Sequence, residues 1–226
     1  MLKPYKRISK RELKQDKFVT YTLRTKEYIE NNARMIMWGA VLILAVIVIS
    51  SFLMRSKRQA EVEANDLLGQ VSIAFAQGNV QQGEQLTKQL IENFKGVDAA
   101  GRGCFMLAKY YWQQSDFINA KSYFSQYLDE YADDPLLSSA AYAGYADCLL
   151  DEGSIQEAAQ NYELAARVDK NSPQAASFLY SAAKAFMEIN DLSRAEKLAN
   201  EIMKNYEKSE YKGKAEILLS MIKLKA

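Results

Sequence analysis

Residues 139–172 read SAAYAGYADCLLDEGSIQEAAQNYELAARVDKNS, and this stretch predicts a helical hairpin. Two alanine-rich segments flank the turn Glu152-Gly153-Ser154, in which glycine can adopt the left-handed backbone that ends a helix. Ala146 precedes the turn and Ala158 follows it. Two antiparallel helices approach closely only where a side chain at the crossing is small, so the alanines indicate tight packing of the two halves.

The same turn recurs through residues 60–226. Self-similarity at a fixed period is the signature of stacked repeats, and here the spacings are 37, 38 and 37 residues. The sequence therefore predicts an all-α fold, a helical-hairpin solenoid of about four repeats, near 62–98, 101–135, 139–173 and 176–210, with a capping helix over 211–224. The four turns are Gln77-Gly78-Asn79, Gln114-Ser115-Asp116, Glu152-Gly153-Ser154 and Ile189-Asn190-Asp191.

This pattern resembles the tetratricopeptide repeat, a helix-turn-helix unit with small side chains at the helix crossing. Repeat three carries the resemblance best. Because the period here exceeds that of the tetratricopeptide repeat, we expect each second helix to run about one turn longer. The matching residues of repeat three are Tyr142, Ala146, Leu149, Gly153, Ala158, Tyr162 and Ala165.

Residues 35–54, MIMWGAVLILAVIVISSFLM, predict a transmembrane helix. The run contains no charged residue, and a helix of its length spans about 30 Å, the thickness of a bilayer core. A cleaved signal peptide is disfavoured, because a long basic region precedes the run and no small-residue cleavage site follows it. We expect an uncleaved single-pass signal anchor.

Residues 1–34 form a basic head with ten basic and four acidic residues, whereas residues 55–226 carry 19 basic and 24 acidic ones. This asymmetry favours a cytoplasmic N-terminus, although the basic residues that directly flank the run balance, three against three. The spacing of Phe18, Tyr21, Thr25 and Tyr28 predicts a short amphipathic helix in the head. It would bind lipid or a cytoplasmic partner, or act only as a topology determinant.

The sequence offers no signature of catalysis. It has no histidine, and Cys104 and Cys148 stand too far apart for a CxxC pair. No Walker loop, Gly-x-Ser-x-Gly or metal-binding loop occurs. We expect no enzyme activity, no catalytic or metal site, no cofactor and no nucleic-acid partner, which leaves protein binding as the function class.

The tetratricopeptide resemblance implies that first helices line a concave partner-binding face, which would hold an extended peptide or a partner helix. The alternative is that the aromatic side chains on these helices pack between repeats. The candidate residues on this face are Arg102, Phe105, Lys109, Trp112, Gln113, Asp147, Leu150, Asp151, Tyr180, Lys184, Met187 and Glu188.

The whole chain resembles the YfgM-like family, ancillary subunits of the Sec translocon, most closely in residues 16–32 directly before the apolar run. This resemblance implies a bacterial inner-membrane protein with a periplasmic C-terminal domain that serves protein export or periplasmic chaperoning. Its partners would be the translocon, a periplasmic chaperone or prolyl isomerase, and exported polypeptides. The alternative is a structural scaffold or adaptor for cell-envelope complexes of the outer membrane or of division, because the repeats also resemble those of envelope assembly factors.

Overall fold

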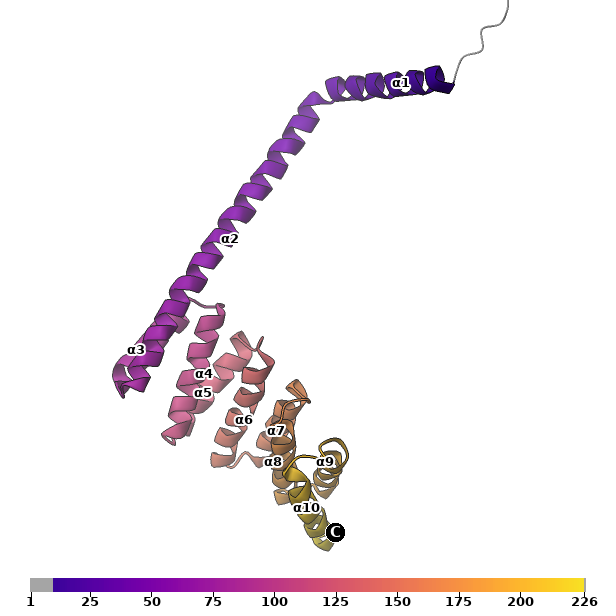
Figure 1. Ribbon diagram of the computed structural model, residues 1–226. Helices are drawn as coiled ribbons and strands as arrows, with labels where there is room; N and C mark the ends of the chain where they lie inside the picture. The colour runs from indigo at the N-terminus through magenta and orange to yellow at the C-terminus, as the bar shows by residue number, and fades with distance from the viewer. Residues whose placement is uncertain (1–9, 226) are drawn as a thin grey trace, which may run out of the picture. The chain divides into compact units, whose positions relative to one another are not determined.

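The computed structural model describes residues 10–225, with side chains from residue 20 onward, and in this part of the chain it contains helices and no strands (Figure 1). The chain divides into two units, residues 1–58 and 59–226. The helices are α1 (Lys10–Asn31), α2 (Ala33–Ala76), α3 (Val80–Asn93), α4 (Asp98–Gln113), α5 (Phe117–Glu130), α6 (Pro135–Asp151), α7 (Ile155–Val168), α8 (Ala175–Glu188), α9 (Leu192–Asn205) and α10 (Tyr211–Lys225).

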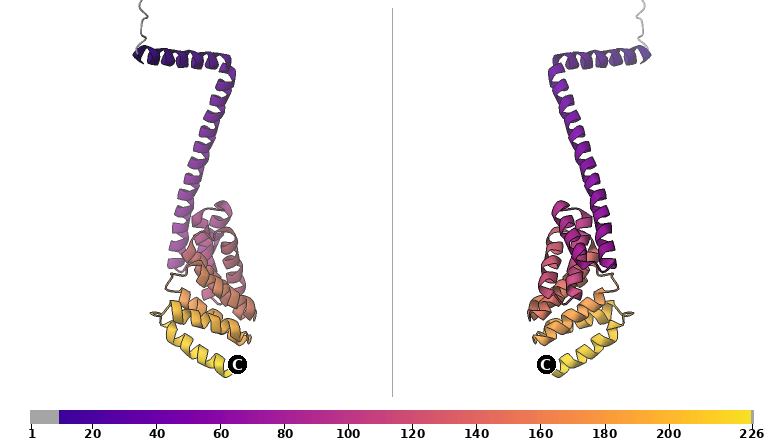
Figure 2. Two further views of the ribbon diagram at one scale, coloured as in Figure 1. Left: turned by 90° about the vertical axis from the view of Figure 1, so that its right-hand side faces the viewer. Right: turned by 90° about the vertical axis from the view of Figure 1, so that its left-hand side faces the viewer.

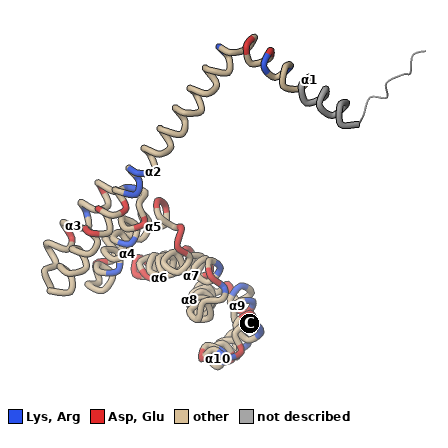
Figure 3. Tube along the Cα trace, turned by 45° about the horizontal axis from the view of Figure 1, so that its top comes forward, with Lys and Arg blue, Asp and Glu red and all other residues tan. Residues whose placement is uncertain are grey.

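The first unit holds α1 and the start of α2. Within the described residues, α2 alone is long and apolar enough to cross a membrane, and its most apolar window has no buried residues. Figure 3 shows this part of α2 as a stretch without charged residues. The predicted head helix falls within α1, whereas residues 1–9 of the head lie outside the described part.

The second unit is a stack of helical hairpins (Figures 1 and 2). The last part of α2 pairs with α3, where Gly83 lies against the Phe75 ring. Three further hairpins follow, α4 with α5, α6 with α7, and α8 with α9. Each hairpin packs on the next, and α10 packs on α9 at the end. The unit is therefore a solenoid in which each repeat buries its apolar side against its neighbours.

The turn inside each hairpin has the same backbone. Its middle residue has a positive φ: 74° at Gly78, 58° at Ser115, 82° at Gly153 and 62° at Asn190. The amide of the next residue donates to the carbonyl five residues earlier, as Ser154 N does to Leu149 O at 2.9 Å. This is the Schellman arrangement, which satisfies carbonyls at the end of the first helix and reverses the chain.

The extra residues of each repeat do not lengthen its second helix, so that prediction was wrong. The second helices α3, α5, α7 and α9 each have 14 residues. The additional length lies between repeats, for example at 131–134 and 169–174. The connection at 131–134 ends with Asp134, whose carboxylate caps α6 by accepting from Leu136 N at 2.8 Å. Pro135 follows at the first helical position, where its ring suits a helix start.

Small side chains occupy the helix crossings, as the repeat pattern predicts. Ala146 and Ala158 are fully buried, and so are their counterparts in the neighbouring repeat, Ala108 and Ala120. Large side chains such as Phe186 fill the space beside them. The buried apolar residues form two clusters, one from α2 to α6 and one from α6 to α10, with close contact between helices at each crossing.

Cys104 and Cys148 belong to this core as free, buried thiols. Burial raises the pKa of each thiol to about 12. Because the thiolate is the reactive form, both side chains are inert at neutral pH.

Candidate functional site

The twelve candidate residues come from three first helices, α4, α6 and α8, and they differ in exposure. Trp112 and Leu150 are 38% and 39% exposed, which is unusual for large apolar side chains inside a packed stack. Phe105, Asp147, Tyr180 and Met187 are half-buried. The other candidates are exposed polar residues: Arg102, Lys109, Gln113, Asp151, Lys184 and Glu188.

Trp112 and Asp147 are brought together across two repeats. The Asp147 carboxylate on α6 accepts a hydrogen bond from the Tyr162 hydroxyl on α7, and the Trp112 side chain on α4 lies close enough to lower the pKa of Asp147. Burial raises the pKa of Asp147 above its ordinary value, and Tyr162 and Trp112 offset part of that rise. The exposed Trp112 ring therefore lies beside a half-buried carboxylate, between repeats two and three.

The raised pKa of Asp147 predicts a pH dependence of stability. Between 3.8, the ordinary carboxyl value, and the raised native value, the folded protein holds more protons at this site than the unfolded chain. The free energy of unfolding should therefore fall as pH rises through this window, and Asp147→Asn should remove that contribution. Thermal unfolding of the full chain in detergent across this pH range measures the difference.

Asp151→Asn, at an exposed carboxylate on the same helix, is the control for loss of a charge. If wild type and Asp147→Asn show parallel pH profiles from acid to neutral, the Asp147 carboxylate does not titrate in the environment described here.

Two aromatic candidates pack within the stack. The Phe105 ring lies 5.9 Å from the Phe124 ring and 5.7 Å from the Tyr127 ring, with edge-to-face geometry. The Tyr180 ring lies 5.7 Å from that of Tyr211 on α10. These two aromatic side chains therefore pack between helices, as the alternative interpretation of the candidates expects. Trp112 differs from them, because part of its ring stays exposed.

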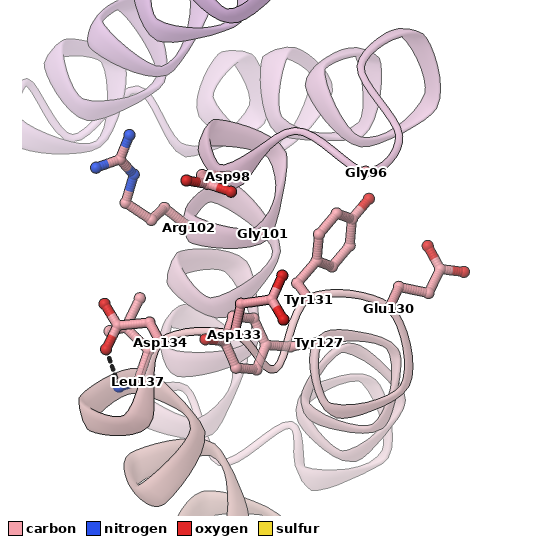
Figure 4. A pocket seen from close by; sticks show the side chains of 10 residues that line it. All are labelled: Gly96, Asp98, Gly101, Arg102, Tyr127, Glu130, Tyr131, Asp133, Asp134 and Leu137. Carbon is pink, nitrogen blue, oxygen red and sulfur yellow. Dashed lines mark hydrogen bonds between the residues drawn. The ribbon is translucent and has the colours of Figure 1, made fainter.

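Arg102 points to a different place, the connection between repeats. Its Nη2 donates to Asn65 Oδ1 at 2.8 Å, which ties α4 to α2. Arg102 also lines a cavity of about 280 Å³ formed by the start of α4, the end of α5 and the start of α6 (Figure 4). Sequence reasoning missed this cavity, because it is built from connections whose lengths and paths the repeat pattern does not specify.

Two of the carboxylates at this cavity stabilise the fold. Glu130 pairs with Lys95 at 3.0 Å, and Asp134 caps α6. Figure 4 shows the Asp134 side chain bonded to the Leu137 amide. Among the described residues there is no cluster of histidine, cysteine, aspartate and glutamate that could hold a metal ion.

Comparison with known proteins identifies the repeat family. A family model described as tetratricopeptide repeat-like domain matches residues 26–171. This range includes the apolar part of α2 together with the first three hairpins. No curated protein matches the chain.

Two solved structures are similar in outline. One is the type III secretion chaperone SycD of Yersinia enterocolitica, in complex with a peptide of the translocator YopD, at 23% identity and a TM-score of 0.46. That match covers 55% of this chain and 92% of SycD. The other is BtubC of P. vanneervenii, at 18% identity and a TM-score of 0.40, covering 74% of this chain and 62% of BtubC.

Proposed function

Because the chain belongs to the tetratricopeptide repeat-like domain family, we propose that it is a non-enzymatic protein-interaction module tethered to a membrane. The observation that carries the proposal is the extent of the family match, because a single family model covers the apolar part of α2 and three hairpins. The apolar part of α2 suits a bilayer core in length and composition, and its most apolar window has no buried residues.

The partner surface in this proposal is the face formed by the candidate residues of α4, α6 and α8, which we call the first-helix face. Trp112 and Leu150 supply exposed apolar surface at equivalent positions of successive repeats. Exposed charges of both signs surround them, including Lys109 and Asp151. An exposed aromatic side chain within a mixed polar rim is typical of the hot spots at which protein partners bind.

The finer proposal is a role in protein export or periplasmic chaperoning at the Sec translocon, as in the YfgM-like proteins that the sequence resembles. The chain would cross the bacterial inner membrane once through residues 35–54, with the N-terminus in the cytoplasm and the repeats in the periplasm. The ten basic residues of the head support this orientation, because a long C-terminal domain translocates largely regardless of its charge. Partners would then be the translocon, a periplasmic chaperone or prolyl isomerase, and exported polypeptides.

Site-specific crosslinking tests the binding face in the full chain within native membranes. A photoreactive residue replaces Leu150 on the first-helix face, and in a matched variant it replaces Leu164, which is 47% exposed on α7. We expect crosslinks to translocon subunits, periplasmic chaperones or exported polypeptides from position 150 and none of these from position 164. Crosslinks to envelope-assembly proteins instead would replace the export role with the scaffold role.

Protease treatment of intact spheroplasts tests the topology. We expect digestion of the repeats and survival of an N-terminal tag. A cleaved tag with protected repeats would contradict the export role, because cytoplasmic repeats do not meet periplasmic clients.

A further inference from the structure

The last helix, α10, occupies the place of the first helix of a fifth repeat. It packs on α9 and also reaches α8, as α6 packs on α5 and reaches α4. Its buried side chains, Ala215, Leu218 and Ile222, belong to the same core as α8 and α9. The turns that precede α8 and α10 match at a shift of 37 residues, because Gln174 N donates to Ser172 Oγ and Tyr211 N donates to Ser209 Oγ, each at 3.2 Å. We use this shift to relate the positions of α10 to those of α8.

One side of α10 is polar, whereas the equivalent side of α8 is apolar. In α8, the fully buried residues Leu179, Ala183 and Phe186 belong to the core that α8 shares with α9. The equivalent positions of α10, given by the 37-residue shift, are Glu216, Ser220 and Lys223, and all three are exposed. This side of α10 needs no covering helix, so α10 ends the repeat stack.

The apolar surface of α10 lies on another side. Ile217, Met221 and Leu224 are 64%, 47% and 88% exposed, and their spacing of four and three residues places them on one side of the helix. The 37-residue shift relates them to Tyr180, Lys184 and Met187, which belong to the first-helix face. We call these three residues of α10 the terminal stripe. It continues the first-helix face, and it is not the side on which the second helix of a fifth repeat would pack.

Two lysines bracket the terminal stripe. Lys214 and Lys225 are equivalent to Ser177 and Glu188 of α8 and lie about 16 Å apart along the helix. Lys214 is exposed; its Nζ pairs with the exposed Glu210 at 3.7 Å and lies 4.1 Å from the centre of the Tyr211 ring, so it remains accessible to a partner. Over its whole length α10 has four lysines and one acidic residue, so this end of the stack is positively charged while residues 55–226 together are acidic.

We propose that the terminal stripe docks an acidic amphipathic helix of a partner protein. Apolar side chains of the partner would cover Ile217, Met221 and Leu224, and its carboxylates would meet Lys214 and Lys225. A stripe with helical spacing on an exposed helix suits a second helix laid along it, because both present ridges of the same period. The inference rests on the proposed interaction function and names a partner chemistry for one end of the first-helix face.

Charge argues against two other occupants. A second copy of the chain packed antiparallel on the stripe would set lysines opposite lysines, which repel. An anionic membrane would approach a face that also carries Asp147, Asp151 and Glu188, whose carboxylates it would repel. An acidic helix satisfies the lysines at the terminal stripe and need not extend to these carboxylates.

The test measures peptide binding to the full chain in neutral-lipid nanodiscs by fluorescence anisotropy. The probe is a labelled synthetic amphipathic helix, long enough to cover the whole terminal stripe, with a row of leucines between glutamates. It is compared with the same helix carrying lysines instead of the glutamates. We expect the acidic helix to bind and the basic one not to bind. Met221→Glu should weaken binding by about tenfold or more, whereas Ile118→Glu, at a 78% exposed apolar residue of α5, should leave it unchanged.

The double variant Lys214→Glu with Lys225→Glu separates charge recognition from simple apolar adhesion. We expect it to reverse the preference, so that the basic helix binds better than the acidic one. Equal binding of both helices to the wild-type protein would overturn the proposal. So would concentration-dependent self-association, or binding to anionic vesicles, if Met221→Glu abolishes it.

A negative result for the terminal stripe is distinguishable from failure of the proposed interaction function. Crosslinking from position 150 reports the interaction function independently of α10. Partner crosslinks there, together with no binding of the acidic helix, would overturn the assignment of the terminal stripe alone.

Discussion

Replacing Phe186 by alanine should lower the free energy of unfolding by about 3–5 kcal/mol, since the change leaves a cavity the size of a ring in a packed core. Phe186 is fully buried in the core formed by repeats three and four and α10. The guanidinium of Arg194 lies 5.2 Å from the centre of its ring, and that contact is lost as well. Urea unfolding of the full chain in detergent, followed by near-ultraviolet circular dichroism, measures the change.

Leu164→Ala is the matched control, because 47% of the Leu164 residue is exposed and less apolar surface returns to water on truncation. Its effect should stay below about 1 kcal/mol. A similar small effect for Phe186→Ala would mean that the α8–α9 crossing is not packed as described.

The second large effect concerns Gly144. Glycine-to-alanine changes inside helices usually stabilise a protein, but Gly144→Ala should destabilise this one. A Cβ atom at Gly144 would overlap Cζ of Phe124, a side chain that is itself buried. The ring must shift within a packed core, so Gly144→Ala should destabilise the protein by about 1–3 kcal/mol. The same unfolding experiment measures this loss.

Gly213→Ala should have the opposite effect on the stability of the same protein. Gly213 is helical in α10, and a Cβ there would meet no atom within 4 Å. Alanine should therefore stabilise the protein by roughly 0.5–1 kcal/mol through its helix propensity. Equal signs for Gly144→Ala and Gly213→Ala would contradict the close approach of α5 and α6 at Gly144.

The sequence predicts features that depend on neighbours in the chain. The turns at Gly78 and Gly153 are visible because a left-handed residue favours glycine, and the turns at Ser115 and Asn190 are found because they fall at the same period. The apolar run is visible because bilayer thickness demands a minimum uncharged length. These rules act within a few residues or through a fixed period, so one sequence suffices to apply them.

Other features depend on contacts that the period does not encode. Phe105 and Tyr180 occupy positions of the first-helix face, yet their rings pack on neighbouring aromatic side chains. Phe105 meets Phe124 in the second helix of its own repeat, whereas Tyr180 meets Tyr211 in the capping helix, so the repeat pattern does not relate the two contacts. The cavity at Arg102 depends on the path of the connections between repeats, which a count of residues does not determine.

The contacts of the solenoid lie within a hairpin or join it to the next one, and this has a mechanical consequence. A globular core resists deformation as a whole, because every element touches many others. Here a pull applied between the two ends of the stack is shared among successive interfaces, and a small tilt at each adds up along the series. The domain should behave as a soft spring whose compliance grows with the number of hairpins, so that it can yield elastically under load without unfolding.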